Sequence, residues 1–200
     1  MTFTAIDFDP WFKKEAKLDD IGADLSLEDL RLATNQSIDH LLSLIEGLTD
    51  ADITFDPVDE EADDPHAKPG EEKIGWSIAH IIVHVTASSE EGAAMSSLLA
   101  RGIAASERPR YETPWQDVTT YAQCVQRLEE SRRIRLAYFD AWPDEPHMDV
   151  LRAGVSERFE AYFGKVNATA AALMGLSHEV GHYDQIVDAR QQALAARQTT

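Results

Sequence analysis

Two pairs of histidines, each spaced four residues apart, are the features of this sequence best suited to chemistry. His178 and His182 form one pair, within the run HEVGHYDQI, and His80 and His84 form the other. Residues four apart lie on one face of a helix, one turn from each other. Two imidazoles placed in this way suit a shared metal ion, and two pairs on facing helices strengthen that interpretation. The alternative is a polar interior in which the histidines hydrogen-bond to each other and to water.

A helical wheel separates the histidines of the C-terminal segment from its ordinary apolar face. His178, His182 and Gln185 lie on one side, and an apolar face lies on the other. The apolar face consists of Leu173, Leu176, Val180 and Val187, and the residues beside the histidines are Ala171, Gly175 and Ala189. These small neighbours leave room for a cleft or for the close approach of another helix.

The same wheel distinguishes the two earlier histidines. His84 lies at the border of an isoleucine stripe, close to Ile81, and His80 lies farther from it. A ligand projects from a partly buried border, so His84 is the better third ligand. For His80 we keep three alternatives, which are a fourth ligand, a residue that supports a ligand, and a surface residue. Three imidazoles with one open coordination position suit Zn²⁺, Ni²⁺ or Fe²⁺.

The elements that hold these residues are predicted to be helices. Three-and-four spacing of apolar residues, with Ser26 and Ser77 as N-caps, predicts helices over 26–48 and 77–101, a third from Pro114 to about Trp142, and a last one over 168–196. The apolar stripe of the second helix includes Ile74. Residues 144–165 are poorly periodic, and signals for strands are absent. We therefore expect an all-α fold, an antiparallel four-helix bundle, as one domain over 1–200 with an N-terminal extension at 1–25.

Residues 56–73 form an acidic loop with eight acids and three prolines. Its near lack of apolar residues favours an insertion or a lid between the first two helices. His66 lies within it and is interpreted as a solvated loop histidine.

Composition narrows the classes of partner. The 200 residues carry a formal net charge of −18, which repels phosphate backbones, so no nucleic-acid partner is expected. No apolar run is long enough to span a membrane, and no signal peptide is recognisable at the N-terminus. A single cysteine, Cys124, excludes an intramolecular disulfide and a cysteine-based zinc cluster. A cytoplasmic protein is the expectation.

Other residues have weaker functional interpretations. Arg132 falls at a core-register position of the third helix, where it could bind a substrate carboxylate, extend its charged end to solvent, or form a salt bridge with one of many acids. Glu90 and Glu91 could orient a histidine or lie exposed. Trp76 and Tyr183 could line a cleft or belong to the core, and Cys124 is interpreted as a small core residue. The assignments of the two glutamates, of Trp76, of Tyr183 and of Cys124 rest on sequence position alone.

The motifs together resemble the DinB/YfiT superfamily of metal-binding four-helix bundles. The resemblance is carried by the opening GWSI at 75–78, by His84 eight residues after the tryptophan, and by His178-x3-His182-x2-Gln185. It covers about residues 26–196. It implies His84, His178 and His182 as ligands of a divalent metal. The chain departs from the family at His80, where many relatives carry an acidic or other polar residue, and in its acidic loop.

The resemblance also implies a range of activities. The family includes bacillithiol S-transferases, a mycothiol-dependent maleylpyruvate isomerase and domains linked to ergothioneine synthesis, so we expect an enzyme that transfers a low-molecular-weight thiol to an electrophilic small molecule. A metal with an open position lowers the pKa of a thiol, and no protein nucleophile is then needed. The alternatives are a non-catalytic metal-binding or stress-response protein and a metal-dependent hydrolase. A homodimer is compatible with such a bundle.

Overall fold

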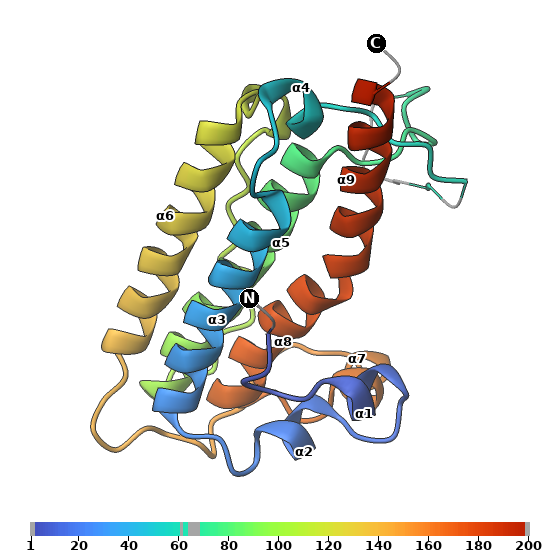
Figure 1. Cartoon of the computed structure of the whole chain (residues 1–200). Helices are drawn as coiled ribbons and strands as arrows, with labels where there is room; N and C mark the ends of the chain where they lie inside the picture. Colours follow the sequence, from blue (N-terminus) through green and yellow to red (C-terminus); the bar gives the residue numbers. More distant parts are fainter. Residues whose placement is uncertain (1–2, 61, 64–68, 199–200) are drawn as a thin grey trace.

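The computed structural model of the chain describes residues 3–60, 62–63 and 69–198, and every regular element among them is helical (Figure 1). The helices in chain order are α1 (Asp9–Phe12), α2 (Leu18–Gly22), α3 (Leu27–Ile45), α4 (Asp50–Ile53), α5 (Ile78–Ala100), α6 (Tyr121–Asp140), α7 (Glu157–Phe163), α8 (Ala168–Gly181) and α9 (Tyr183–Gln198), with a 3-10 turn, η1 (Trp115–Asp117), before α6. The expected all-helical class is confirmed. His66, in the acidic loop, lies outside the described residues.

Polar side chains begin four of the long helices, as N-cap residues do. The Ser26 hydroxyl accepts the N–H of Asp29, whose carboxylate accepts the N–H of Ser26 in return, so an aspartate completes this capping box. The side chains of Ser77, Thr120 and Asn167 likewise accept a backbone N–H in the first turn of α5, α6 and α8, and Thr120 forms a capping box with Gln123 as well. The helix starts predicted at Ser26 and Ser77 are confirmed.

Helix α5 is the centre of the fold. It packs closely against both α8 and α6, and most of its residues are buried. One apolar group forms where α5 and α8 meet the N-terminal segment, and another forms where α5 meets α3 and α6. Ile81 and Ile82 are fully buried, whereas Ile74, expected in the same stripe, precedes the helix and is 46% exposed. A helix covered on most sides holds its remaining face in a fixed position.

The chain crosses the length of the molecule between α5 and α6. Figure 1 shows α5 and α6 side by side and running in the same direction, whereas α3 and α8 run in the opposite direction. The antiparallel arrangement expected from the sequence therefore does not extend to this pair. Two parallel helices need a long connection, and residues 102–120, named the crossover, provide it. The crossover returns along α5 from its C-terminal to its N-terminal end.

Glycines allow α5 and α8 to approach each other closely. A Cβ atom on Gly175 would lie 2.5 Å from the Cα atom of Ser89, and one on Gly92 would lie 2.7 Å from the carbonyl oxygen of Ala171. Contacts that short do not occur between real side chains and backbone, so each position requires glycine. The small residues noted beside the histidines thus serve a close helix crossing.

The last predicted helix is interrupted. Helix α8 ends at Gly181, His182 is its C-cap, and α9 starts at Tyr183, so the single helix expected over 168–196 is wrong (Figure 1). Glycine weakens a helix because it gains more backbone freedom on unfolding than other residues, which explains a break at this point. The stretch 144–165, which shows little periodicity, contains the short helix α7.

Segments outside the long helices also pack on them. In the N-terminal extension, Phe8 and Leu18 are buried in the group formed by α5 and α8. At the start of the acidic loop, the backbone of Val58 forms two hydrogen bonds with the Gln192 side chain of α9. No helix among the described residues is both long and apolar enough to cross a membrane.

Candidate metal centre

Three histidines, one from α5, one from α8 and one at the C-cap of α8, meet in the structure. One nitrogen from each of His84, His178 and His182 lies within 4.8 Å of the others. The Nε2 atoms of His84 and His178 are 2.8 Å apart, and the ring centroids of His178 and His182 are 4.7 Å apart. This group, named the histidine cluster, contains the three residues that the sequence indicated as ligands.

Neighbouring side chains orient two of the three rings. The Glu112 carboxylate of the crossover lies 3.5 Å from Nδ1 of His84, and the amide oxygen of Gln185 lies 2.7 Å from Nδ1 of His182. An acceptor on one ring nitrogen fixes the tautomer and directs the other nitrogen toward a shared ion. Gln185, which the sequence placed beside the histidines, therefore supports His182.

The histidine cluster favours neutral imidazoles. Burial lowers the pKa of His178 to about 3, and the nearby rings of His182 and His84 lower it further in the same direction. Burial also lowers the pKa of His182, although the hydrogen bond with Gln185 opposes that shift. Only a neutral imidazole offers a lone pair to a cation, so a proton does not compete with a metal ion at these two rings near neutral pH.

The histidine cluster lies on the wall of a large cavity. Its volume is about 950 Å³, and it is bounded by α5, α8, the crossover and parts of the N-terminal segment and α7. His84 and His178 both line it. A volume in this range accommodates a small molecule of drug size. A metal ion held by the cluster would therefore be reachable by a substrate.

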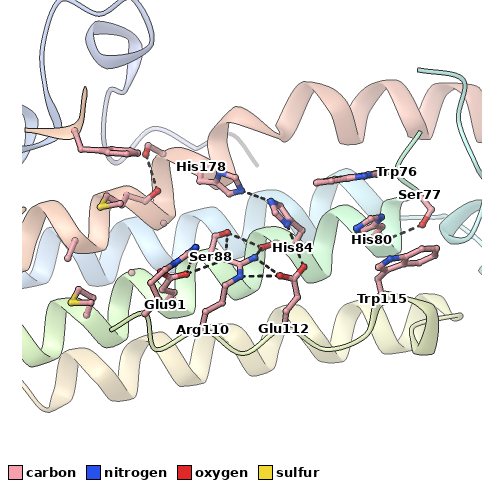
Figure 2. A pocket seen from close by; sticks show the side chains of 18 of the residues that line it. Trp76, Ser77, His80, His84, Ser88, Glu91, Arg110, Glu112, Trp115 and His178 are labelled. Carbon is pink, nitrogen blue, oxygen red and sulfur yellow. Dashed lines mark hydrogen bonds and ion pairs between the residues drawn. The ribbon is translucent and has the colours of Figure 1, made fainter. Parts of the chain in front are cut away.

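The crossover forms one long wall of this cavity by pairing with α5 residue by residue. Arg108 contacts Glu91, Arg110 contacts Ser88, Glu112 contacts His84, and Trp115 stacks on His80. From Arg108 to Trp115 the residue numbers of the crossover increase, while those of its partners on α5 decrease from Glu91 to His80. The two segments therefore run in opposite directions (Figure 2). These pairs place basic, acidic and aromatic side chains one after another along the length of the cavity.

His80 lies within an aromatic stack at one end of the cavity. Its ring lies 4.3 Å from the ring of Trp76 and 4.7 Å from that of Trp115, nearly parallel to both (Figure 2). It is not among the three residues of the histidine cluster. Trp76 also packs edge-on against His84 at 4.8 Å, so it lines the cavity and contacts a candidate ligand.

The opposite end of the cavity is basic. Arg108, Arg110 and Arg152 line it together with Glu91. The sequence alone did not indicate these arginines, because residues 103–113, which contain Arg108 and Arg110, form no helix and have no apolar periodicity, and Arg152 lies in the poorly periodic stretch 144–165. One signal was present: Arg108, Arg110 and Glu112 alternate, and alternate residues of an extended segment point to one side.

Arg132, the arginine that the sequence singled out, lies elsewhere. Its guanidinium donates to Asp39 at 2.6 Å and to Glu129 at 3.0 Å, and it bonds to Asn35 as well. It is not among the residues that line the cavity. Its surroundings match the salt bridge that was considered as the alternative to binding a substrate.

Four further residues are placed as follows. Glu91 lines the cavity and pairs with arginines, whereas Glu90 pairs with Arg127 of α6. Tyr183 packs in the core, and its hydroxyl lies 3.1 Å from that of Ser37. Cys124 is fully buried, and this burial raises its pKa to about 12, so it is an unreactive core residue as predicted.

A second group of charges lies inside the protein. Arg135 and Glu179 are 1% and 0% exposed, and the guanidinium donates to the carboxylate at 2.8 Å. Ser89 donates to the same carboxylate oxygen, and Ser131 accepts from Arg135. These four residues, named the buried ion-pair cluster, connect α5, α6 and α8. Glu179 follows His178 directly, so this cluster also fixes the helix that carries two histidines.

The donor set of the histidine cluster fits a divalent metal. Three nitrogen donors converge, two have their outer nitrogens anchored, and burial keeps two neutral. Imidazole suits zinc, nickel and iron, and a site with three protein ligands leaves a position open. No other group of three metal-ligating residues with this geometry occurs in the part of the chain that the structure describes.

The chain was also compared with known proteins. A family model described as the DinB superfamily matches residues 33–186. No curated protein and no solved structure matches the chain. The matched range includes α5, the crossover and all three residues of the histidine cluster, and it excludes the N-terminal extension.

Proposed function

Because this chain belongs to the DinB superfamily, we propose that it is a metal-dependent enzyme that transfers a low-molecular-weight thiol to an electrophilic small molecule. The observation that carries the proposal is the position of the histidine cluster, on the wall of a cavity large enough for two small reactants. The proposal includes the four-helix bundle of that superfamily, formed by α3, α5, α6 and α8 with α9. We also propose that the protein is cytoplasmic, that it has no nucleic-acid partner, and that it can form a homodimer.

His84, His178 and His182 would hold the metal, with zinc, nickel and iron as the candidates. A bound divalent cation with an open position supplies Lewis acidity, which lowers the pKa of a thiol. Glu112 and Gln185 keep His84 and His182 in the orientation that this requires. The ring of Trp76 packs beside His84 and contacts one side of its imidazole.

The reacting nucleophile would come from outside the chain. Cys124, the only cysteine, is fully buried and has a raised pKa. A buried thiol with so little thiolate is a poor nucleophile. The cavity lining supports an organic substrate, since it combines tryptophan and methionine side chains with arginines and glutamates. The thiol sulfur would form a new bond to the electrophilic carbon as the leaving group departs with its electron pair.

A metal-dependent hydrolase is less well supported. Such an enzyme usually needs a carboxylate base beside the metal-bound water. The nearest candidate, Glu112, lies behind the His84 ring, on its Nδ1 side, and its other oxygen accepts from Arg110 at 2.6 Å. That position suits a residue that orients a ligand. A non-catalytic metal-binding protein is the remaining alternative, and it does not explain a cavity with a basic end and an aromatic end on either side of the histidine cluster.

The test is a conjugation assay on metal-loaded protein. Cysteine, glutathione, bacillithiol and mycothiol are each incubated with a fluorogenic alkylating agent, and the conjugate is measured for wild type and His84→Ala. We expect one thiol to be conjugated by wild type at least about tenfold faster than by His84→Ala. His147→Ala, which removes an exposed histidine outside the cavity, is the matched control and should match wild type. Metal-dependent hydrolysis of ester substrates without a thiol requirement would support the hydrolase instead.

A further inference from the structure

The basic end of the cavity carries more positive than negative charge. Arg108 forms a two-pronged contact with Glu91 at 2.6 and 2.8 Å. Arg110 donates to Glu112 at 2.6 Å and to the Ser88 hydroxyl at 2.8 Å. Both carboxylates are thereby engaged. The third arginine of this end, Arg152, is left as an additional charge, in a chain whose net charge is −18.

Arg152 has unused capacity to bind an anion. Among the described residues it forms no ion pair, and its Nε atom is buried without a hydrogen-bond partner. The cost of burying an unpaired polar group gives it a preference for a partner. Burial and the charge of nearby Arg108 lower its pKa, although the charge of Glu91 opposes them, which indicates a cation that is incompletely compensated.

The guanidinium of Arg152 is held in place. It lies over the ring of Phe159, 5.1 Å from the ring centroid, and its backbone N–H donates to the carbonyl of Val166 at 2.8 Å. Phe159 in turn packs on Phe163, which lines the cavity. A guanidinium fixed by stacking loses little freedom when it binds a planar carboxylate.

The basic end and the histidine cluster share one cavity at a defined separation. Glu91, which Arg108 and Arg110 contact, follows His84 by seven residues on α5. A rise of 1.5 Å per residue makes that separation about 10 Å along the helix. Ser88 and Arg110 line the stretch of cavity between these groups, and Met174 of α8, one turn before His178, lines the cavity as well. A ligand that reaches from the basic end to the histidine cluster therefore passes both polar and apolar side chains.

The geometry points to a carboxylate-binding subsite formed by Arg152 with Arg108 and Arg110, at the end of the cavity away from Trp76 and Trp115. Its ligand is a small molecule with a carboxylate at one end and its reacting group at the histidine cluster. The opposite end, with Asp56 and Glu71, repels an anion, so the orientation has one direction. The identity of the reacting group rests on the proposed function, whereas the carboxylate preference does not.

The test measures binding to Zn²⁺-loaded protein by calorimetry. The probes are 8-mercaptooctanoate and 8-mercapto-1-octanol, whose chains have a length similar to the separation between the histidine cluster and the basic end. We expect the acid to bind wild type about tenfold more tightly than the alcohol, since a hydrogen bond between two charged groups is stronger than one to a neutral hydroxyl. Arg152→Gln should abolish this difference, and Arg152→Lys, which keeps the charge, should retain part of it.

Arg133→Gln, which neutralises an exposed arginine of α6, is the matched control and should leave the difference intact. Equal affinity of acid and alcohol for wild type, or an undiminished difference in a folded Arg152→Gln protein, would overturn the proposal. Octanoate and octanol, which carry no thiol, show which of the two reactants supplies the carboxylate. If octanoate also binds more tightly than octanol, the subsite binds the carboxylate of the acceptor. If only the two thiol probes differ in affinity, the subsite binds the carboxylate of the thiol. A carboxylate preference in a protein that conjugates no thiol would refute the proposed function and leave the subsite standing.

Discussion

Two clusters of arginine and glutamate side chains lie on neighbouring faces of α5, and they differ in access and in charge balance. Ser89 belongs to the buried ion-pair cluster, in which one arginine meets one glutamate away from solvent. Ser88 and Glu91 face the cavity, where Arg108 and Arg110 pair with two glutamates and a third arginine has no ion pair among the described residues. The residues of the run SSEE at 88–91 are thus divided between a structural and a binding environment.

The type of residue does not by itself decide the role of an ion pair in this protein. Charges that are matched and enclosed fix the position of helices, because removal of one partner leaves the other buried and unpaired. Charges that are in excess and reachable from a cavity are available to a ligand. Removal of one charge should therefore destabilise the protein more in the buried ion-pair cluster than at the basic end of the cavity.

The largest effect is expected in the buried ion-pair cluster. Arg135→Met leaves Glu179 without its cation, and this should lower the free energy of unfolding by about 3–5 kcal/mol. The double variant Arg135→Met/Glu179→Leu removes both charges and should recover most of the loss. Urea denaturation measures all three proteins. A loss below about 1 kcal/mol for Arg135→Met would contradict the structural role of this cluster.

A smaller effect is expected where the crossover meets the histidine cluster. Glu112→Gln removes the carboxylate beside His84 and should lower the affinity for Zn²⁺ by about 10–100-fold, because such groups orient a ligand and increase its basicity. A competition titration with a chromophoric chelator gives the affinity. The control is Glu129→Gln, which alters an ion pair of α6 outside the cavity. An equal fall in both variants would remove the specific role of Glu112.

The smallest effect is expected at the open edge of the basic end. The Arg108 side chain is 62% exposed, so its pair with Glu91 is screened by solvent. Arg108→Gln should therefore change the free energy of unfolding by less than about 1 kcal/mol, and added salt should reduce even that change. Urea denaturation at low and high ionic strength is the measurement. A loss as large as that of Arg135→Met would mean that the two clusters do not differ.

The residues that could be predicted from the sequence are those governed by local periodicity. The spacing of His178 and His182, the border position of His84 and the caps Ser26 and Ser77 all follow from helical geometry, which acts within a few residues. The burial of Cys124 follows from its place beside an apolar rhythm. These features need no knowledge of how distant segments meet.

The features that could not be predicted depend on contacts between distant segments. The arginines of the crossover acquire their role only because α5 and α6 run in the same direction, which brings residues 108–115 back along α5. The spacing of apolar residues along α6 placed Arg132 on the core side of that helix. Its partner, Asp39, lies on α3, which the spacing along α6 could not reveal. The break at His182 had a local signal in Gly181, although such a glycine is also tolerated inside helices.

The metal content of the purified protein shows whether the histidine cluster is a metal centre. Wild type, His178→Ala and His147→Ala are supplemented in turn with Zn²⁺, Ni²⁺ and Fe²⁺, desalted and analysed by inductively coupled plasma mass spectrometry. With three histidine ligands in the site, we predict about one equivalent of one metal in wild type and in His147→Ala, and almost none in His178→Ala. No bound metal in wild type, or the same content in a folded His178→Ala protein, would contradict the assignment of the histidine cluster as a metal centre.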